Sequence, residues 1–180
     1  MSPLVSSVNQ ILSILTIIGQ ALIASFFISL LVYKKGGAIA KSFVGKYGIA
    51  LAFIIALIAT FGSLFFSEIA GFEPCKLCWF QRILMYPQAV LFAIAFWKKD
   101  NGVFRYAIPL SIIGLAIAAY HYYIQVTAVA SVICSPGSTE SCVTRPFLNF
   151  GYISIPMMSL TAFLVIIFIG TIKKQFDKTT

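Results

Sequence analysis

The chain has 180 residues, of which 60% are hydrophobic and only 10% are charged. Soluble domains carry roughly 25% charged residues, so a soluble core of this size could not bury so much apolar surface and the excess must face lipid. The net charge of +8 comes from short basic segments between apolar runs, and no basic stripe interleaves with aromatic side chains. Nucleic-acid binding is therefore not expected.

Five apolar segments follow one another along the chain. A transmembrane helix requires ~20 residues, or ~17 at the short end. The candidate spans are 10–33, 47–67, 77–97, 105–127 and 152–172. The third span reaches the required length only if its helix begins near Leu77, ahead of Arg82. The sequence therefore predicts an all-α integral membrane protein with five spans.

The first span has a signal peptide as its alternative interpretation, because Ala38-Ile39-Ala40 has the small residues of a cleavage site. However, this segment lacks a basic region before its apolar run, the run is too long, and its lysines follow it. A retained helix is therefore favoured. Ala21 and Ser25 are small residues spaced by four, so we expect them to pack against a neighbouring helix.

The basic residues orient the spans. Only Lys76, Arg82 and Arg145 lie toward one side of the membrane, and ten basic residues lie toward the other. Those ten are Lys34, Lys35, Lys41, Lys46, Lys98, Lys99, Arg105, Lys173, Lys174 and Lys178. The positive-inside rule then predicts an external N-terminus and a cytoplasmic C-terminus. The loops around 71–78 and 126–152 are both expected outside the cytoplasm.

The four cysteines all fall in these outer loops. Cys75 and Cys78 form a C-x-x-C pair in the first loop, and Cys134 and Cys142 lie in the second. An even number of cysteines on the oxidising side of a membrane favours disulfide chemistry. A metal site is not expected, because seven residues separate Cys134 from Cys142 and zinc ligand pairs are usually spaced by two to four. Structural disulfides remain the main alternative, above all for the second pair.

The first pair points to redox catalysis. A C-x-x-C disulfide closes a very small ring, so it restricts the unfolded chain little, whereas two cysteines at this spacing exchange electrons readily. Cys78 is expected in the first turn of the third helix, after Pro74, where the positive end of the helix dipole should lower its thiol pKa. Catalysis by all four cysteines is the favoured interpretation.

Arg82 and His121 are the ionisable residues expected near the first pair within the membrane. Arg82 follows Cys78 by four residues, which places it on the same helix face about 6 Å deeper, where it could donate hydrogen bonds to a carbonyl acceptor. His121 lies about 9 Å from the outer end of the fourth span, at a similar depth. The alternatives are a snorkelling arginine and a histidine bonded within the bundle core. No Rossmann, haem or metal motif is present, and a lipid-soluble quinone requires none.

Three segments carry a resemblance to a known family. Glu73-Pro74-Cys75-Lys76-Leu77-Cys78-Trp79-Phe80-Gln81-Arg82, followed by Met85-Tyr86-Pro87, resembles the signature of the DsbB family of disulfide-forming membrane oxidoreductases. Tyr120-His121-Tyr122 and Phe150-Gly151-Tyr152-Ile153-Ser154-Ile155-Pro156 are similar to that family too, particularly its BdbC branch. The likeness covers about residues 47–172. It implies a four-helix bundle in a bacterial cell membrane that reoxidises an extracytoplasmic thioredoxin-fold thiol oxidase of the DsbA/BdbD kind and passes the electrons to menaquinone or ubiquinone.

The resemblance also implies roles for single residues. Cys78 would react with the quinone, and Cys75 would be its resolving partner. Cys134 would form the mixed disulfide with the partner protein, and Cys142 would exchange with Cys75. Arg82 would contact the quinone, and His121 would line the same site.

The chain departs from the family in one respect. The family usually has four spans and a cytoplasmic N-terminus, whereas this chain adds 10–33. We therefore expect an N-terminal transmembrane helix with a cytoplasmic basic loop (1–40), followed by the four-helix redox bundle (41–180). Electron flow in the reverse direction is a weaker alternative, because no cysteine lies on the cytoplasmic side. A non-enzymatic scaffold or metal-handling protein is the other alternative.

Overall fold

The computed structural model describes residues 3–32, 36–127, 142 and 147–177. The helices are α1 (Pro3–Val32), α2 (Gly36–Leu64), α3 (Lys76–Lys98), α4 (Phe104–Thr127) and α6 (Ile155–Asp177). A π-helical turn, η1 (Phe65–Ile69), extends α2, and a 3-10 turn, η2 (Asn101–Val103), precedes α4. Five helices in the described part of the chain are long and apolar enough to cross a membrane, which confirms an all-α, multi-pass membrane protein.

Each expected span falls largely within one of the five helices, although α1, α2 and α6 extend beyond the predicted ends. Helix α3 begins at Lys76, one residue before the predicted start, so it does begin ahead of Arg82. The segment 34–46, predicted as a basic loop, is mostly helical, because α2 already begins at Gly36. Its alanines and lysines are good helix formers, so the helix extends beyond the apolar run. Lys34 and Lys35 lie outside the described residues.

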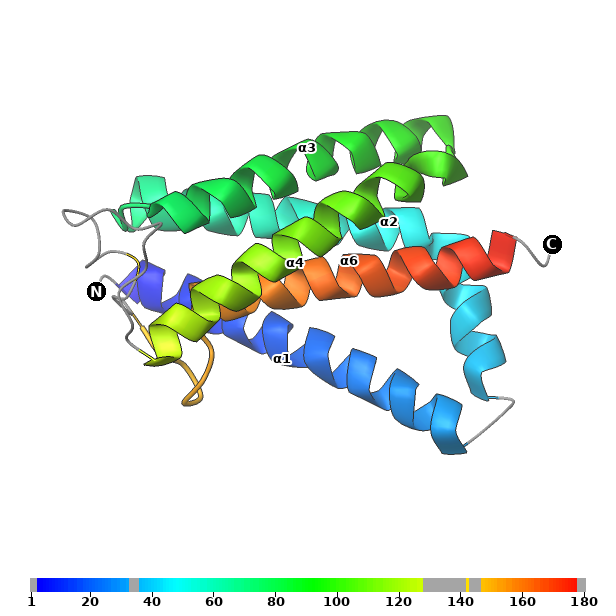
Figure 1. Ribbon diagram of the computed structural model, residues 1–180, viewed down its shortest axis with the longest axis horizontal. Coiled ribbons are helices and arrows are strands. Elements are labelled where there is room, and N and C mark those ends of the chain that lie inside the picture. Colours follow the sequence, from blue (N-terminus) through cyan, green and yellow to red (C-terminus); the bar gives the residue numbers. More distant parts are fainter. Residues whose placement is uncertain (1–2, 33–35, 128–141, 143–146, 178–180) are drawn as a thin grey trace.

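Four helices form a closed ring, and the fifth lies against it. Helix α2 packs on α3, α3 on α4, α4 on α6, and α6 on α2, while α1 lies outside this ring against α6 and α2 (Figure 1). Helices α4 and α6 approach closely where Gly114 meets the Phe163 ring, since a Cβ at Gly114 would overlap that ring. The N-terminus lies at the same end as the start of α3, and the C-terminus lies at the opposite end (Figure 1).

Helix α1 packs through a different face from the one predicted. Ala21 and Ser25 are both exposed, so the prediction that they form the contact is wrong. The buried face instead carries polar side chains at helical spacing, namely Asn9, Ser13 and Thr16. Hydrogen-bonding side chains at the contact are typical of membrane helices, because lipid is as apolar as leucine and hydrophobic burial does not drive their association.

Candidate active site

The N-terminus of α3 positions the first cysteine pair. Cys75 is the N-cap residue of α3, with extended backbone (φ −68°, ψ 169°), and its Sγ accepts a hydrogen bond from the backbone N–H of Cys78 at 3.4 Å. The two sulfur atoms lie 3.1 Å apart, and both cysteines are free thiols. The C-x-x-C spacing therefore puts one sulfur at the helix cap and the other in the first turn, where the sequence predicted Cys78 to lie.

His121 contacts this pair from α4. Its Nε2 lies 3.6 Å from Cys75 Sγ, and its Nδ1 lies 3.1 Å from Nε2 of Gln81. An amide NH2 group can only donate, so Nδ1 accepts and the ring proton lies on Nε2, facing the Cys75 sulfur. Gln81 was not among the site residues predicted from the sequence. Its signal was available, because a glutamine one turn after Cys78 is a polar side chain within a membrane span.

These neighbours determine which sulfur carries negative charge. The pKa of the Cys75 thiol is lowered from 9.0 to about 4, chiefly because the Cys78 thiol donates to its sulfur, with a further contribution from His121. Burial raises the pKa of Cys75 but is outweighed. The lowered pKa was predicted for Cys78 from its place at the start of the helix. The structure assigns it to Cys75, because Cys75 Sγ receives hydrogen bonds from both the backbone and the side chain of Cys78.

Arg82 points into the bundle instead of toward the membrane surface. Its side chain is buried, and it donates from Nε to Ser63 Oγ at 2.9 Å and from Nη2 to the Ser63 carbonyl at 3.0 Å. Its guanidinium also lies 5.3 Å from the centre of the Trp79 ring. Within the described residues no carboxylate forms an ion pair with it. The positive charge therefore remains available to an electron-rich ligand, and the snorkelling alternative is not supported.

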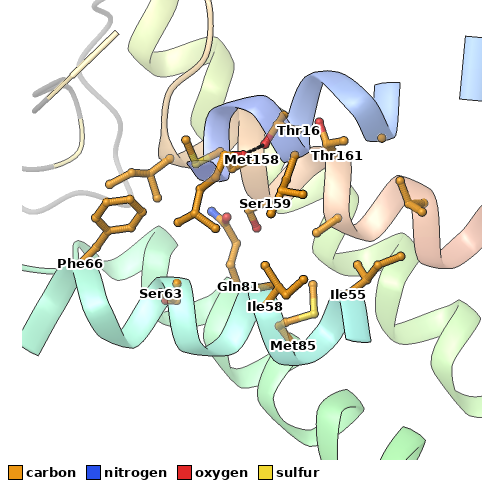
Figure 2. A pocket seen from close by; sticks show the side chains of 18 of the residues that line it. Thr16, Ile55, Ile58, Ser63, Phe66, Gln81, Met85, Met158, Ser159 and Thr161 are labelled. Carbon is orange, nitrogen blue, oxygen red and sulfur yellow. Dashed lines mark hydrogen bonds between the residues drawn. The ribbon is translucent and has the colours of Figure 1, made fainter. Parts of the chain in front are cut away.

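Arg82 and Cys78 both line an apolar cavity of about 300 Å³ between α1, α2, α3 and α6. Its polar lining includes Ser63, Cys78, Gln81, Arg82 and Tyr86. Figure 2 shows Gln81 pointing into this cavity, with Thr16 and Thr161 on one wall and Ile55, Ile58 and Ser63 on the facing wall.

The cavity divides the predicted site residues. Cys75 and His121 are not among the described residues that line it. The structure thus brings Cys78 together with Arg82, and His121 together with Cys75. The prediction that His121 lines the same site as Arg82 does not match this arrangement. Gln81 is the residue that reaches both groups.

The second cysteine pair is described only through Cys142. Cys142 is fully buried and disulfide-bonded, and it belongs to one apolar cluster with Cys75, Leu77 and Ile124. Cys134 lies outside the described residues, so the prediction that it pairs with a partner protein stays a prediction. The cluster places Cys142 in the neighbourhood of Cys75, the cysteine with which it was expected to exchange.

A metal site with four cysteine ligands is not formed, because the sulfur of Cys142 is held in a disulfide and a zinc ligand must be a thiolate. A smaller group does exist. The ligand atoms of Cys75, Cys78 and His121 lie within 4.8 Å of one another, which is a spacing at which a soft cation could be held. The site can therefore perform thiol–disulfide exchange, and its reduced form could also bind a metal.

Comparison with known proteins gives consistent matches. The profile of the family "Disulfide bond formation protein DsbB" matches residues 46–172. The SPbeta prophage-derived disulfide bond formation protein B of Bacillus subtilis (strain 168) is 45% identical over 120 residues, which cover 67% of this chain and 80% of that relative. The probable disulfide formation protein C 2 of Bacillus anthracis is 45% identical over 140 residues, covering 75% of this chain and 98% of the relative.

A further relative, the disulfide bond formation protein C of Bacillus subtilis (strain 168), is 44% identical over 125 residues. These residues cover 69% of this chain and 91% of that relative. No solved structure matches the chain at a significant level. All of the site residues from Cys75 to Cys142 lie within the matched range, whereas α1 lies before it.

Proposed function

Because this chain belongs to the DsbB family of membrane thiol:disulfide oxidoreductases, we propose that it oxidises an extracytoplasmic thioredoxin-fold dithiol protein and passes the electrons to a membrane quinone. The partner would be of the DsbA/BdbD kind, and the reaction would support disulfide formation in secreted proteins. The observation that carries this proposal is the position of Cys78, which lies beside Arg82 on the wall of an apolar cavity within the membrane-spanning helices.

The charge distribution supports an external location for the thiols. Lys46, Lys98, Lys99 and Arg105 lie at the end of the bundle opposite to the start of α3. Short basic segments stay on the cytoplasmic side, so the end that carries Cys75 would face outward. This orientation gives a secreted or surface-bound dithiol protein access to the redox loops.

The cavity suits a quinone in both size and chemistry. Its walls are mainly apolar, which suits a lipid-soluble molecule, and its polar side chains gather beside Cys78. A guanidinium has five N–H donors, and Ser63 accepts from two of the nitrogens of Arg82, so other donors remain for a carbonyl oxygen. When bound, a quinone supplies an acceptor for two electrons and two protons.

Electrons would enter the first pair by thiol–disulfide exchange. A thiolate of the reduced second pair attacks Cys75 Sγ in the oxidised Cys75–Cys78 disulfide, and Cys78 Sγ leaves as a thiolate beside Arg82. The other thiolate of the second pair then displaces Cys75 from the mixed disulfide. The second pair is now a disulfide and the first pair a dithiol. The structure has the same pattern among its described cysteines, with Cys142 bonded and the first pair free.

The hydrogen bonds around Cys75 support its part in this exchange. Cys75 is released as a thiolate at the last step, and a thiol of low pKa is a good leaving group. The Cys78 thiol and His121 stabilise that negative charge, which is why the pKa of Cys75 lies near 4. Two electrons then pass from the Cys75 thiolate and the Cys78 thiol to the acceptor as the Cys75–Cys78 disulfide forms again, and the one proton of the Cys78 thiol is released.

The decisive experiment is anaerobic quinone reduction by the purified protein, supplied with a reduced thioredoxin-fold partner. We expect turnover by the unchanged chain and loss of at least 1000-fold in Cys78→Ser, on the order of the effect of removing a catalytic nucleophile. A partner whose own cysteines are replaced by serine is the control and should give no turnover. An undiminished rate of quinone reduction in Cys78→Ser would contradict the mechanism. Inert thiols together with stoichiometric bound zinc would favour the metal-handling alternative.

A further inference from the structure

Helix α1 lies outside the family match, which begins at residue 46, yet it forms a wall of the cavity. The lining residues that it contributes are Leu12, Leu15, Thr16, Ile18, Gly19 and Leu22. The cavity is therefore not made by the four-helix ring alone. An element that the family match does not include closes the side between α2 and α6.

Polar side chains hold α1 in one rotation about its axis. Gln20 donates from Nε2 to Thr161 Oγ1 at 3.0 Å and accepts from the Tyr152 hydroxyl at 2.9 Å. Asn149 donates from Nδ2 to Ser13 Oγ at 2.7 Å. These three hydrogen bonds attach α1 to α6 and to the turn that precedes it, so the cavity-facing side of α1 is fixed.

Two glycines bring α1 into direct contact with both neighbours. A Cβ at Gly62 of α2 would come within 3.1 Å of Leu12 Cδ1, and one at Gly19 would lie 3.4 Å from Thr161 Cγ2. Helix α1 therefore meets α2 near Leu12 and α6 near Gly19.

The cavity has a polar end and an apolar end. On α1 it extends from Leu12 to Leu22, which corresponds to roughly 15 Å along the helix. Ser63 and Arg82 lie toward the outer end, while Leu22, Ile55 and Val165 line the deeper part. The Cys78 sulfur, the Arg82 guanidinium and the Ser63 hydroxyl thus lie toward one end of the cavity, and a mainly apolar section extends beyond them.

We propose that α1 is a binding wall for the isoprenoid tail of the quinone, so that this helix sets how well long-tailed quinones bind. The inference rests on the proposed function and names the part of the substrate that α1 recognises. The ring would lie beside Cys78 and Arg82, and the tail would run inward along α1. Thr16 is central to the wall, since it is buried and its hydroxyl is engaged by its own helix, with Oγ1 donating to the Leu12 carbonyl at 2.8 Å.

The test replaces Thr16 by a larger side chain in the full chain. Thr16→Phe fills the tail section, and Ile14→Phe adds a phenyl ring to an exposed position on α1 that does not line the cavity. In Thr16→Phe we expect the KM for a long-tailed quinone to rise about tenfold, the effect of overpacking at a well-fitted site, with kcat unchanged. The KM for a quinone with a very short tail and the KM for the dithiol partner should both stay the same. Ile14→Phe should change none of these values.

The possible outcomes distinguish a failure of the proposed function from a failure of the role proposed for α1. Absence of quinone reduction by the unchanged chain would contradict the proposed function itself. Normal quinone reduction with equal KM values in Thr16→Phe and Ile14→Phe would contradict only the role of α1. An equal rise for long-tailed and short-tailed quinones would also contradict it, because the wall would then act on the ring or on the fold.

Photolabelling tests the same point if Thr16→Phe does not fold. The unchanged full chain is irradiated with a quinone that carries a photoreactive group on its tail, with and without excess unlabelled quinone. We expect displaceable labelling of the peptide that contains residues 12–22. Displaceable labelling confined to α2, α3 or α6 would overturn the inference.

Discussion

The two sides of the N-terminus of α3 have different chemistry, although they share one pair of cysteines. On the side facing α4, Cys75 is held by hydrogen bonds and contacts His121. On the side facing α2, Cys78 borders an apolar cavity together with Arg82 and no histidine. One dithiol thus has a sulfur prepared for exchange with other thiols and a sulfur that faces a lipid-like space. The contrast shows how two identical side chains three residues apart can take different roles.

The largest expected effect concerns the pKa of the Cys75 thiol, on the side facing α4. Because the pKa of Cys75 lies near 4, this thiol should be ionised at neutral pH and should become protonated only as the pH falls through about 4. An ordinary cysteine titrates near 8.5 instead. The thiolate absorbance of the reduced protein, followed from acid to neutral pH, measures the midpoint. Cys75→Ser should remove the step, and a midpoint near the ordinary value in the unchanged chain would refute the assignment.

Substitutions of Cys78 and His121 test which neighbour lowers the pKa of Cys75. Cys78→Ala and His121→Phe should both raise the pKa of Cys75, because each removes a hydrogen-bonding partner of the thiolate. The rise should be greater for Cys78→Ala, since the Cys78 thiol is the larger cause. Equal midpoints in the two variants would show that the histidine contributes as much as the second cysteine.

Arg82→Ala tests the cavity side, where Arg82 is expected to bind the quinone. A hydrogen bond to a charged group contributes about 1.5–3 kcal/mol, so the KM for quinone should rise by about 10- to 100-fold while Cys75 keeps its pKa. Steady-state quinone reduction at varied quinone concentration measures this value. Ile83→Ala alters the next residue, which is exposed on the lipid-facing surface, and should leave the KM unchanged. No effect of Arg82→Ala would reduce the arginine to a structural role.

Gln81→Met should affect both sides at once, because Gln81 lines the cavity and also binds His121. We expect a rise of about threefold in the KM for quinone, on the scale of one lost neutral hydrogen bond, and a small rise in the pKa of Cys75. Gln88→Met is the matched control. Gln88 is a buried glutamine of the same helix that accepts from Ser111 and does not line the cavity, so its loss should lower stability only. If Gln81→Met changed only the KM for quinone, or only the pKa of Cys75, Gln81 would not link the cavity to Cys75.

Ser63→Ala should give the smallest effect. Its hydroxyl accepts from Arg82 Nε and from the Tyr86 hydroxyl, but the Ser63 carbonyl still binds Arg82 after the substitution. Single side-chain hydrogen bonds in membrane proteins contribute about 0.6 kcal/mol on average, which corresponds to a two- to threefold rise in the KM for quinone. Ser67→Ala is the control, because among the described residues Ser67 bonds only within its own helical segment and to Glu68. An equal change in both serine variants would contradict a specific role for Ser63.

The sequence predicted the features that depend on local order along the chain. Long apolar runs identified the helices, and the C-x-x-C spacing placed Cys78 in the first turn of α3. The four-residue step from Cys78 to Arg82 correctly put both on one face, because helical periodicity determines that relation within a single element. Each of these predictions required only one helix.

The features that were missed depend on how helices rotate against one another. His121 was expected beside Arg82 from its depth, but depth does not say which neighbour a side chain faces, and His121 faces Cys75 instead. Likewise Ala21 and Ser25 had suitable spacing but lie on the exposed side of α1. The lowered pKa of Cys75 also depends on tertiary contacts, since it requires a particular sulfur–sulfur geometry and a histidine from another helix.

The polar contacts of α1 make this helix an intramolecular ligand of the bundle. Lipid tails compete for the same apolar surfaces, so α1 remains in place through its hydrogen bonds at Ser13 and Gln20 and through its covalent link to α2, which keeps its effective concentration high. The balance between α1 docked on the four-helix ring and α1 detached into the bilayer would then be set by these hydrogen bonds. A substitution that weakens Gln20 would shift this equilibrium, and the four-helix ring would lose one wall of its cavity while keeping its fold.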